Sequence, residues 1–190
     1  MELEIRPTKL AGVVEIIPWH ITDHRGCLTR FFDEKELKKK IGGIPEWKQI
    51  SLVHSKHKNV LRGMHVQLPP EMEGKMLVAT RGRMFWAVID IRKKSPTLGE
   101  WLAVDLTAEK HNALFVPRGF AHGCLSITNN AEVMAFADNR FREDLSAGII
   151  WNDSDVNIKW PLDCVKPLIS ETHKNYGTWK EFVRTTKGVL

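Results

Sequence analysis

The sequence is poor in cysteine and has no long apolar run, and both absences restrict what the protein can be. Its three cysteines, Cys27, Cys124 and Cys164, are odd in number and share no CxxC spacing. Because the N-terminus also lacks the apolar stretch of a secretion signal, the sequence predicts free thiols in a reducing compartment. No apolar run approaches the roughly 20 residues of a membrane-spanning helix. We therefore expect a cytoplasmic protein with no membrane partner.

Positive charge is only moderately in excess over negative charge. The chain has 28 Lys and Arg against 23 Asp and Glu, which gives a net charge of +5 and a pI of about 9.2. An anionic partner fits this excess, whether nucleic acid, membrane surface or phosphorylated small molecule. The basic clusters at 38–40 and 54–58 are short and lack the interleaved aromatics of a single-strand nucleic-acid track. The sequence thus favours solvated surface charge and predicts no nucleic-acid partner.

The sequence shows neither an internal repeat nor a Gly/Ser linker, so its 190 residues predict one domain. We expect a barrel core at about 47–137, an N-terminal strand at 12–17 and helix at 33–41 within 1–46, and a wrapping segment at 138–190 with a short helix near 178–185. Short β-rich runs separated by turns indicate an all-β sandwich or barrel. The runs are 47–53, 59–68, 75–80, 84–91, 100–106, 112–117, 124–128 and 132–137.

Polar residues in the run NVLRGMHVQ, 59–67, are the first candidates for a site. Side chains alternate along a strand, so His65 and Gln67 face the same side and can both point into a barrel. Arg62 lies three residues before His65 and shares that face only if the strand bulges at Gly63. The alternative is a surface strand with scattered polar residues.

The segment 116–123, VPRGFAHG, places His122 after a Pro/Gly turn, in a PxGxxH arrangement. With His65, Gln67 and Lys75 it has the layout of the two cupin motifs, in which histidines and a glutamate surround a metal. Here Gln67 and Lys75 stand at two of the ligand positions, and a protonated lysine has no lone pair for a cation. The sequence therefore predicts no metal site and a pocket suited to an anionic or enolate-forming substrate.

Several motifs in register resemble the dTDP-4-dehydrorhamnose 3,5-epimerase family, from about residue 13 to residue 170. They are NVLRGMHVQ (59–67), EGKMLV (73–78), DIRKKSPTLGEW (90–101), VPRGFAHG (116–123), the pair 131–132, GIIWND (148–153) and IKWP (158–161). The resemblance implies a cupin-type double-stranded β-helix, that is a jelly-roll barrel, with short flanking helices. It also implies a homodimer, no metal and no organic cofactor, and a role in deoxysugar and surface polysaccharide biosynthesis.

The resemblance assigns roles to individual residues. Members of the family remove a proton next to the C4 ketone of a nucleotide-linked 4-keto-6-deoxy sugar and return one to the opposite face at C3, C5 or both. The catalytic base falls on His65, and the lysine near the enolate oxygen falls on Lys75. Substrate-binding positions are Arg62, Gln67, His122, Gln49 and Arg25.

The chain departs from the family at two catalytic positions. The carboxylate that orients the histidine base falls on His173, and the tyrosine that reprotonates the sugar falls on Phe141. The single tyrosine, Tyr176, lies elsewhere in the sequence. Each lost acid or base function can cost roughly 10²- to 10⁴-fold in rate. Three explanations fit these departures. The protein epimerises one carbon only, with another proton donor in place of the tyrosine; it catalyses a different keto-sugar reaction; or it binds the sugar nucleotide without catalysis.

The nucleotide-contacting element DERGxFxE reads DHRGCLTR here, at 23–30. Cys27 offers no stacking face, and Arg30 reverses a charge. A CDP-, GDP- or UDP-linked sugar therefore fits as well as a dTDP-linked one. The alternatives to an epimerase are a sugar-nucleotide-binding protein, another keto-sugar isomerase and a metal-dependent oxygenase on the same barrel.

Overall fold

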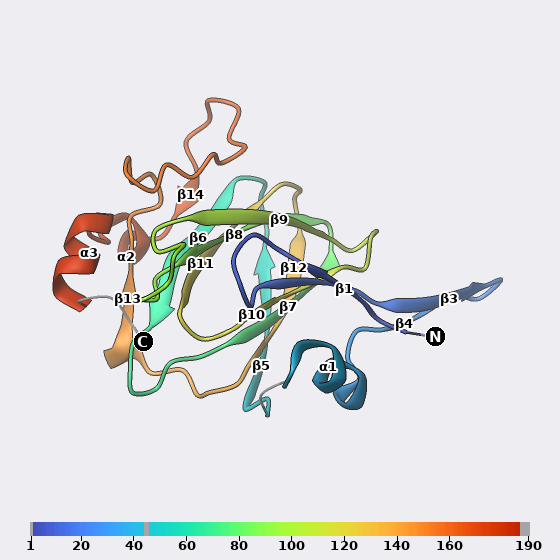
Figure 1. Cartoon of the computed structure of the whole chain (residues 1–190). Coiled ribbons are helices and arrows are strands. Elements are labelled where there is room, and N and C mark those ends of the chain that lie inside the picture. Colours follow the sequence, from blue (N-terminus) through green and yellow to red (C-terminus); the bar gives the residue numbers. More distant parts are fainter. Residues whose placement is uncertain (1, 44–45, 187–190) are drawn as a thin grey trace.

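The computed structural model describes residues 2–43 and 46–186, and its centre is a pair of facing antiparallel sheets (Figure 1). The first sheet has the strand order β1-β2-β10-β7-β12-β5. The second has the order β13-β6-β11-β8-β9, with β14 paired in parallel to β6. This is the cupin jelly roll expected from the sequence.

The strands of the first sheet are β1 (Glu4–Pro7), β2 (Val14–Ile17), β5 (Gln49–Ser55), β7 (Lys75–Arg81), β10 (Ala113–Val116) and β12 (Ala131–Ala137). Those of the second sheet are β6 (Val60–Gln67), β8 (Arg83–Asp90), β9 (Trp101–Thr107), β11 (Phe120–Ser126), β13 (Ser146–Gly148) and β14 (Leu168–Ile169). Each of the eight β-rich runs of the sequence overlaps a strand. One boundary was wrong, because β11 begins at Phe120, which places His122 within the strand and not before it.

Alternation along the strands explains how the two sheets pack. Leu77 and Val133 of the first sheet meet Trp86, Leu106 and Cys124 of the second in one buried cluster. The intervening side chains of each sheet point outward, as a period of two requires. The core thus fills one part of the space between the sheets.

Helices cover the outer faces of the sheets. Helix α1 (Glu34–Ile41) begins at Asp33, whose side chain accepts a hydrogen bond of 3.0 Å from the backbone N–H of Glu36, and Leu37 packs against the first sheet. Acidic residues in its first turn and lysines in its last complement the helix dipole, as the sequence indicated. Helix α3 (Trp179–Thr186) buries Phe182 against the second sheet.

The sequence did not indicate several short elements. These are β1, β13, β14, the 3₁₀ turn η1 (Glu143–Leu145) and helix α2 (Glu171–Lys174). The turn expected at 23–26 is the tip of a hairpin formed by β3 (Trp19–Asp23) and β4 (Gly26–Arg30), which projects away from the barrel (Figure 1). None of the helices in the described ranges is long and apolar enough to cross a membrane.

Candidate active site

Two histidines meet on neighbouring strands of the second sheet. His65 on β6 is paired with His122 on β11, and their ring centroids are 4.6 Å apart. Burial lowers the pKa of His65 well below its usual range, and the positive charges of Lys75 and Arg62 lower it further. Burial also lowers the pKa of His122. Both imidazoles are therefore neutral near pH 7, and a neutral imidazole can accept a proton.

A bulge in β6 brings Arg62 to the same site, as the sequence required. Arg62 is paired with Cys124 and His65 with His122, so two residues of β6 stand opposite Gly123 alone. Gly63 has φ of 106°, and a Cβ there would lie 2.6 Å from the carbonyl oxygen of His122. Only glycine fits that position without displacing the neighbouring backbone.

Lys75 enters the site from the other sheet, at the start of β7. Its Nζ lies 2.6 Å from Oε1 of Glu73, and the two side chains are 17% and 8% exposed. The Lys75 charge contributes to the lowered pKa of both His65 and His122, which places it on the same interior. Sequence reasoning missed Glu73, although a carboxylate two residues before the lysine was a usable signal.

Gln67 and Gln49 hold one loop at the edge of the site. Oε1 of Gln67 accepts a hydrogen bond of 2.7 Å from the backbone N–H of Arg142, and its Nε2 donates to the carbonyl oxygen of Arg140 at 2.9 Å. Oε1 of Gln49 accepts a hydrogen bond of 2.6 Å from the backbone N–H of Phe141. Both glutamines therefore fix the loop that carries Phe141, whose side chain is 62% exposed.

His173 lies directly against His65. Helix α2 follows β14, and its His173 ring stacks on that of His65 at 5.6 Å with an interplanar angle of 15°. Nδ1 of His173 accepts a hydrogen bond of 3.2 Å from the backbone N–H of Gly63, so its own proton resides on Nε2. Burial and the nearby Arg62 lower the pKa of His173. His65 thus faces a neutral ring here and not a carboxylate.

Tyr176 lies behind His173, with the two ring centroids 5.4 Å apart. Burial raises the pKa of Tyr176, so its phenol keeps its proton at neutral pH. Gly148 leaves room for the tyrosine, because a Cβ there would lie 2.2 Å from its Cε2 atom. His173 therefore contacts both His65 and Tyr176.

The structure does not bring Arg25 to the other candidates within one chain. It lies at the tip of the hairpin formed by β3 and β4, which projects from the barrel (Figure 1). Its Nη2 is 2.6 Å from Oδ2 of Asp23. Both side chains are exposed. The other six predicted residues belong to the barrel: His65, Lys75, Arg62, Gln67, His122 and Gln49.

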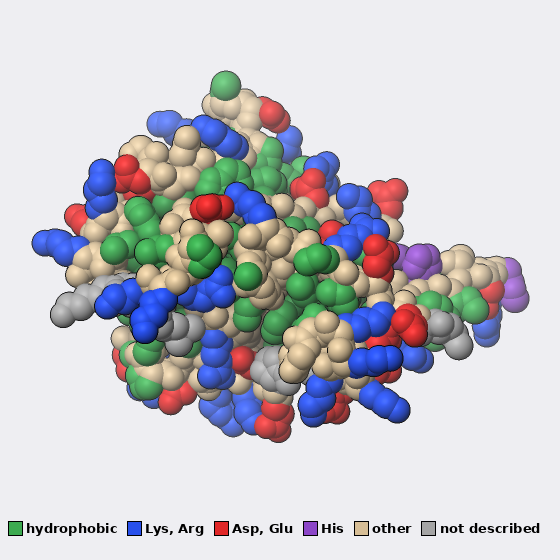
Figure 2. Space-filling view, viewed as in Figure 1, with side chains coloured by type: hydrophobic (Ala, Val, Ile, Leu, Met, Phe, Trp, Pro, Cys, Tyr) green, Lys and Arg blue, Asp and Glu red, His purple; other side chains and the backbone are tan. Residues whose placement is uncertain are grey.

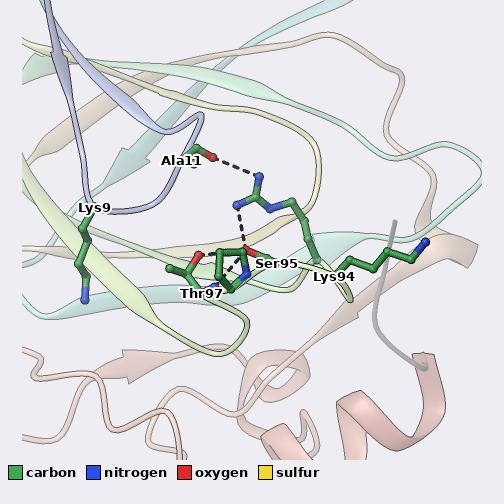
Figure 3. Close-up of a pocket in the computed structure, with 7 residues that line it drawn as sticks. Lys9, Ala11, Lys94, Ser95 and Thr97 are labelled. Atoms are coloured by element: carbon green, nitrogen blue, oxygen red, sulfur yellow. Dashed lines mark hydrogen bonds between the residues drawn. The ribbon is translucent and has the colours of Figure 1, made fainter.

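A separate hollow of about 450 Å³ lies over the loop between β8 and β9 (Figure 3). Arg92 lines it and donates to the carbonyl oxygen of Ala11 at 3.2 Å and to the buried carboxylate of Asp90 at 2.6 Å. Ser95 and Thr97 also donate to that carboxylate, at 2.6 and 2.7 Å. These bonds account for the loop's order and for the role of Arg92 in it.

Among the residues that the structure describes, no three His, Cys, Asp or Glu side chains are grouped so that they could hold a metal ion. The interior instead combines neutral imidazoles with a lysine and an arginine. Such a set can remove a proton from carbon and stabilise the negative charge that develops on a neighbouring oxygen. The fold and site thus define a cupin-type barrel equipped for acid–base chemistry.

Comparison with known proteins identifies the kind of enzyme. Residues 7–181 match the model of the dTDP-4-dehydrorhamnose 3,5-epimerase family. An enzyme of that name from Shigella flexneri is 36% identical over 174 residues, which covers 91% of this chain and 94% of the relative. One from Methanothermobacter thermautotrophicus is 33% identical over 184 residues, which covers 95% of this chain and 96% of the relative. The chain therefore belongs to the dTDP-4-dehydrorhamnose 3,5-epimerase family, and it is an isomerase.

Solved structures agree with this assignment. The 4-keto-6-deoxy sugar epimerase NovW of Streptomyces spheroides superposes with a TM-score of 0.91 at 26% identity, covering 98% of this chain and 92% of that one. The rmlC epimerase of Mycobacterium tuberculosis superposes with a TM-score of 0.91 at 28% identity, covering 97% of this chain and 92% of that one. An epimerase from Legionella pneumophila, solved with dTDP-4-keto-L-rhamnose, gives 0.88 at 27% identity, covering 93% of each chain.

Proposed function

We propose that this chain epimerises a nucleotide-linked 4-keto-6-deoxy sugar by removing a proton from a carbon next to the ketone. The observation that carries the proposal is the neutral, half-buried His65 on one sheet with the Lys75 ammonium on the facing sheet. His65 takes the proton, and Lys75 donates to the oxygen on which the enolate charge forms. The chemistry needs no metal and no organic cofactor.

Charge and position suggest how the substrate binds. Arg62 and His122 lie beside the base, and a guanidinium matches the oxygens of a diphosphate. The amides of Gln67 and Gln49 are engaged with the loop at 140–142, so we assign them to shaping the sugar pocket as well as contacting its rim. Relatives that carry dTDP in their names make that nucleotide the first to test.

We further propose a homodimer in which the hairpin of one subunit reaches the other. The cross-strand pair Ile21 and Leu28 on the hairpin is 56% and 64% exposed, and Ile50 and Leu52 on the edge strand β5 are 61% and 60% exposed. Hydrophobic side chains are visible along the hairpin in Figure 2. Such an arrangement would carry Arg25 to the partner's site. Light scattering should give twice the chain mass, and Leu28→Asp should give the monomer.

We propose that the chain forms a single cupin-type unit that works in the cytoplasm, where nucleotide sugars are made. Unfolding followed by both Trp fluorescence and far-UV circular dichroism should give one shared transition. Two separate transitions would contradict the single unit.

A second function, sugar-nucleotide binding without catalysis, is favoured by Phe141 and His173. A phenyl ring has no proton to return, and a neutral imidazole gives His65 no negative charge. Proton NMR in D₂O separates the two functions. An epimerase replaces the C3 or C5 proton of dTDP-, CDP- or GDP-4-keto-6-deoxyglucose by deuterium, whereas a binding protein shifts the ligand signals without exchange.

Replacing the base provides the direct test. We expect His65→Asn to lower exchange by at least 10²-fold, because the amide cannot take up the proton. The exposed His57 supplies a matched control, and His57→Asn should retain the rate. Exchange that persists in His65→Asn would show that another group is the base.

A further inference from the structure

Epimerisation requires that a proton leave one face of the sugar carbon and that another arrive on the opposite face. In this barrel the two faces of a substrate would meet two different walls, because β6 and β7 belong to the facing sheets. His65 is on the β6 wall and Lys75 on the β7 wall. The donor that completes inversion has to come from the β7 wall.

The only tyrosine of the sequence, Tyr176, lies on the β6 wall with His65 and not on the β7 wall. Tyr176 follows α2, which follows the strand β14 paired with β6. The His173 ring lies 5.4 Å from the Tyr176 ring and 5.6 Å from the His65 ring. The phenol is also hydrogen-bonded to Ser146 of β13, the strand paired with β6, so it belongs to the wall that carries His65.

The β7 wall carries a different acid. Lys75 pairs with Ala137 of β12, and Ala137 pairs with Gln49 of β5, so Lys75 and Gln49 project from the same face of the first sheet. The loop with Phe141 leaves this sheet after β12, and Gln49 binds its backbone. Gln67 of β6 binds the same loop, so Phe141 lies where the chain passes from one sheet to the other, at the end of the barrel that also holds Lys75.

The other carboxylate at this end is already committed. Oδ1 of Asp138 accepts a hydrogen bond of 2.7 Å from the backbone N–H of Gly74, and its Oδ2 accepts one of 3.0 Å from Nε of Arg118. Glu73, by contrast, binds Nζ of Lys75 at 2.6 Å in a nearly buried pair. Because a lysine ammonium has three N–H donors, this bond leaves two for the substrate.

We propose that the Lys75 ammonium, held by Glu73, delivers the proton to the carbon face opposite His65 and so replaces a tyrosine as the acid of the reaction. This assignment rests on the proposed epimerase function. Lys75 is the catalytic residue of the step, and Glu73 is a positioning residue.

The proton balance of the step closes without a co-reactant. His65 takes the carbon-bound proton, the C–H electron pair becomes the enolate, and the enolate carbon then takes a proton from Nζ of Lys75. The products are the inverted carbon, an imidazolium and a neutral amine. Water returns the imidazolium proton to the amine, since Lys75 is 17% exposed. An ammonium and a phenol are acids of comparable strength, so the exchange of one for the other is chemically reasonable.

The test compares deuterium exchange with formation of the inverted sugar in Lys75→Arg. Arginine keeps a cation for the enolate oxygen but holds its proton too tightly to act as an acid. We expect inversion to fall at least 10²-fold, while exchange through His65 falls less than about tenfold. Glu73→Gln should lower the ratio of inversion to exchange in the same direction. The exposed Lys56 gives the control, and Lys56→Arg should leave both rates as they are.

Restoring the tyrosine sharpens the test. The double variant Phe141→Tyr with Lys75→Arg should regain inversion, because a phenol then stands at the position that the family resemblance gives to the reprotonating tyrosine. Equal losses of exchange and inversion in Lys75→Arg, or no rescue by Phe141→Tyr, would overturn the assignment. Absence of exchange in the unaltered protein would instead overturn the proposed epimerase, and this step with it.

Discussion

Replacing His173 by aspartate should make His65 a stronger base. His173 is neutral and stacks on His65 at 5.6 Å, so the imidazolium formed during proton abstraction faces no negative charge on that side. An aspartate at 173 would stabilise the imidazolium and raise the pKa of His65. The matched control is His173→Asn, which keeps an acceptor for the N–H of Gly63 without the charge.

The size of the effect follows from the separation of the two groups. A unit charge at 5.6 Å, the distance between the ring centroids, contributes about 3 kcal/mol at an effective dielectric constant of about 20. Because residue 173 is partly exposed, solvent screening reduces this to about 1.5 kcal/mol, or roughly one pKa unit. If all of this energy reached the transition state, proton abstraction would be about tenfold faster.

Two measurements check this prediction. The imidazole carbon signals of His65, followed by NMR against pH, should titrate about one unit higher in His173→Asp than in His173→Asn. Deuterium exchange into the substrate should be faster in the aspartate variant at pH 8. An unchanged titration of His65 would refute the electrostatic argument, and a raised pKa with an unchanged rate would refute the assignment of His65 as the base.

Two further predictions concern the rest of the barrel. Burial alone would raise the pKa of Asp90, but hydrogen bonds, the strongest from Arg92, lower it to about 2. The ionised carboxylate therefore stabilises the fold fully above about pH 4, and this stabilisation is lost as the pH falls toward 2. Asp90→Asn should cost about 2 kcal/mol of unfolding free energy at pH 7, measured by urea titration; a stability equal to the unaltered protein would contradict this. Burial raises the pKa of Cys124 to about 12, whereas Cys27 and Cys164 are exposed. Maleimide at pH 7 should therefore label two thiols in the folded protein and three after denaturation, and three rapid labels without denaturant would show that Cys124 is accessible.

Local signals in the sequence were sufficient for most of the barrel. Alternating β-branched residues and turn residues gave the eight strands, and the order of acids and lysines gave α1, whose cap is Asp33. The period of two even required the bulge at Gly63, since Arg62 and His65 could share a face in no other way. These features depend on contacts within a few residues, which a sequence displays directly.

The parts of the site that were missed depend on contacts between distant segments. The hydrogen bond from Gly63 to His173 joins residues 110 positions apart, and the strand β14 that leads to α2 has only two residues. The bonds of Gln49 and Gln67 to the Phe141 loop span 92 and 75 positions. Glu73 was missed for another reason, because nothing was inferred from a carboxylate two residues before Lys75.

In the proposed mechanism, the two-sheet architecture lets a chain without the tyrosine keep the chemistry of an epimerase. Inversion depends on acid and base groups approaching the carbon from opposite sides, and the sandwich supplies those sides as β6 and β7. Which residue type serves on each wall is a secondary matter, provided that it can give or take a proton there. Substitutions on the His65 wall should therefore alter the rate of proton abstraction. Substitutions on the Lys75 wall should alter the ratio of inversion to exchange.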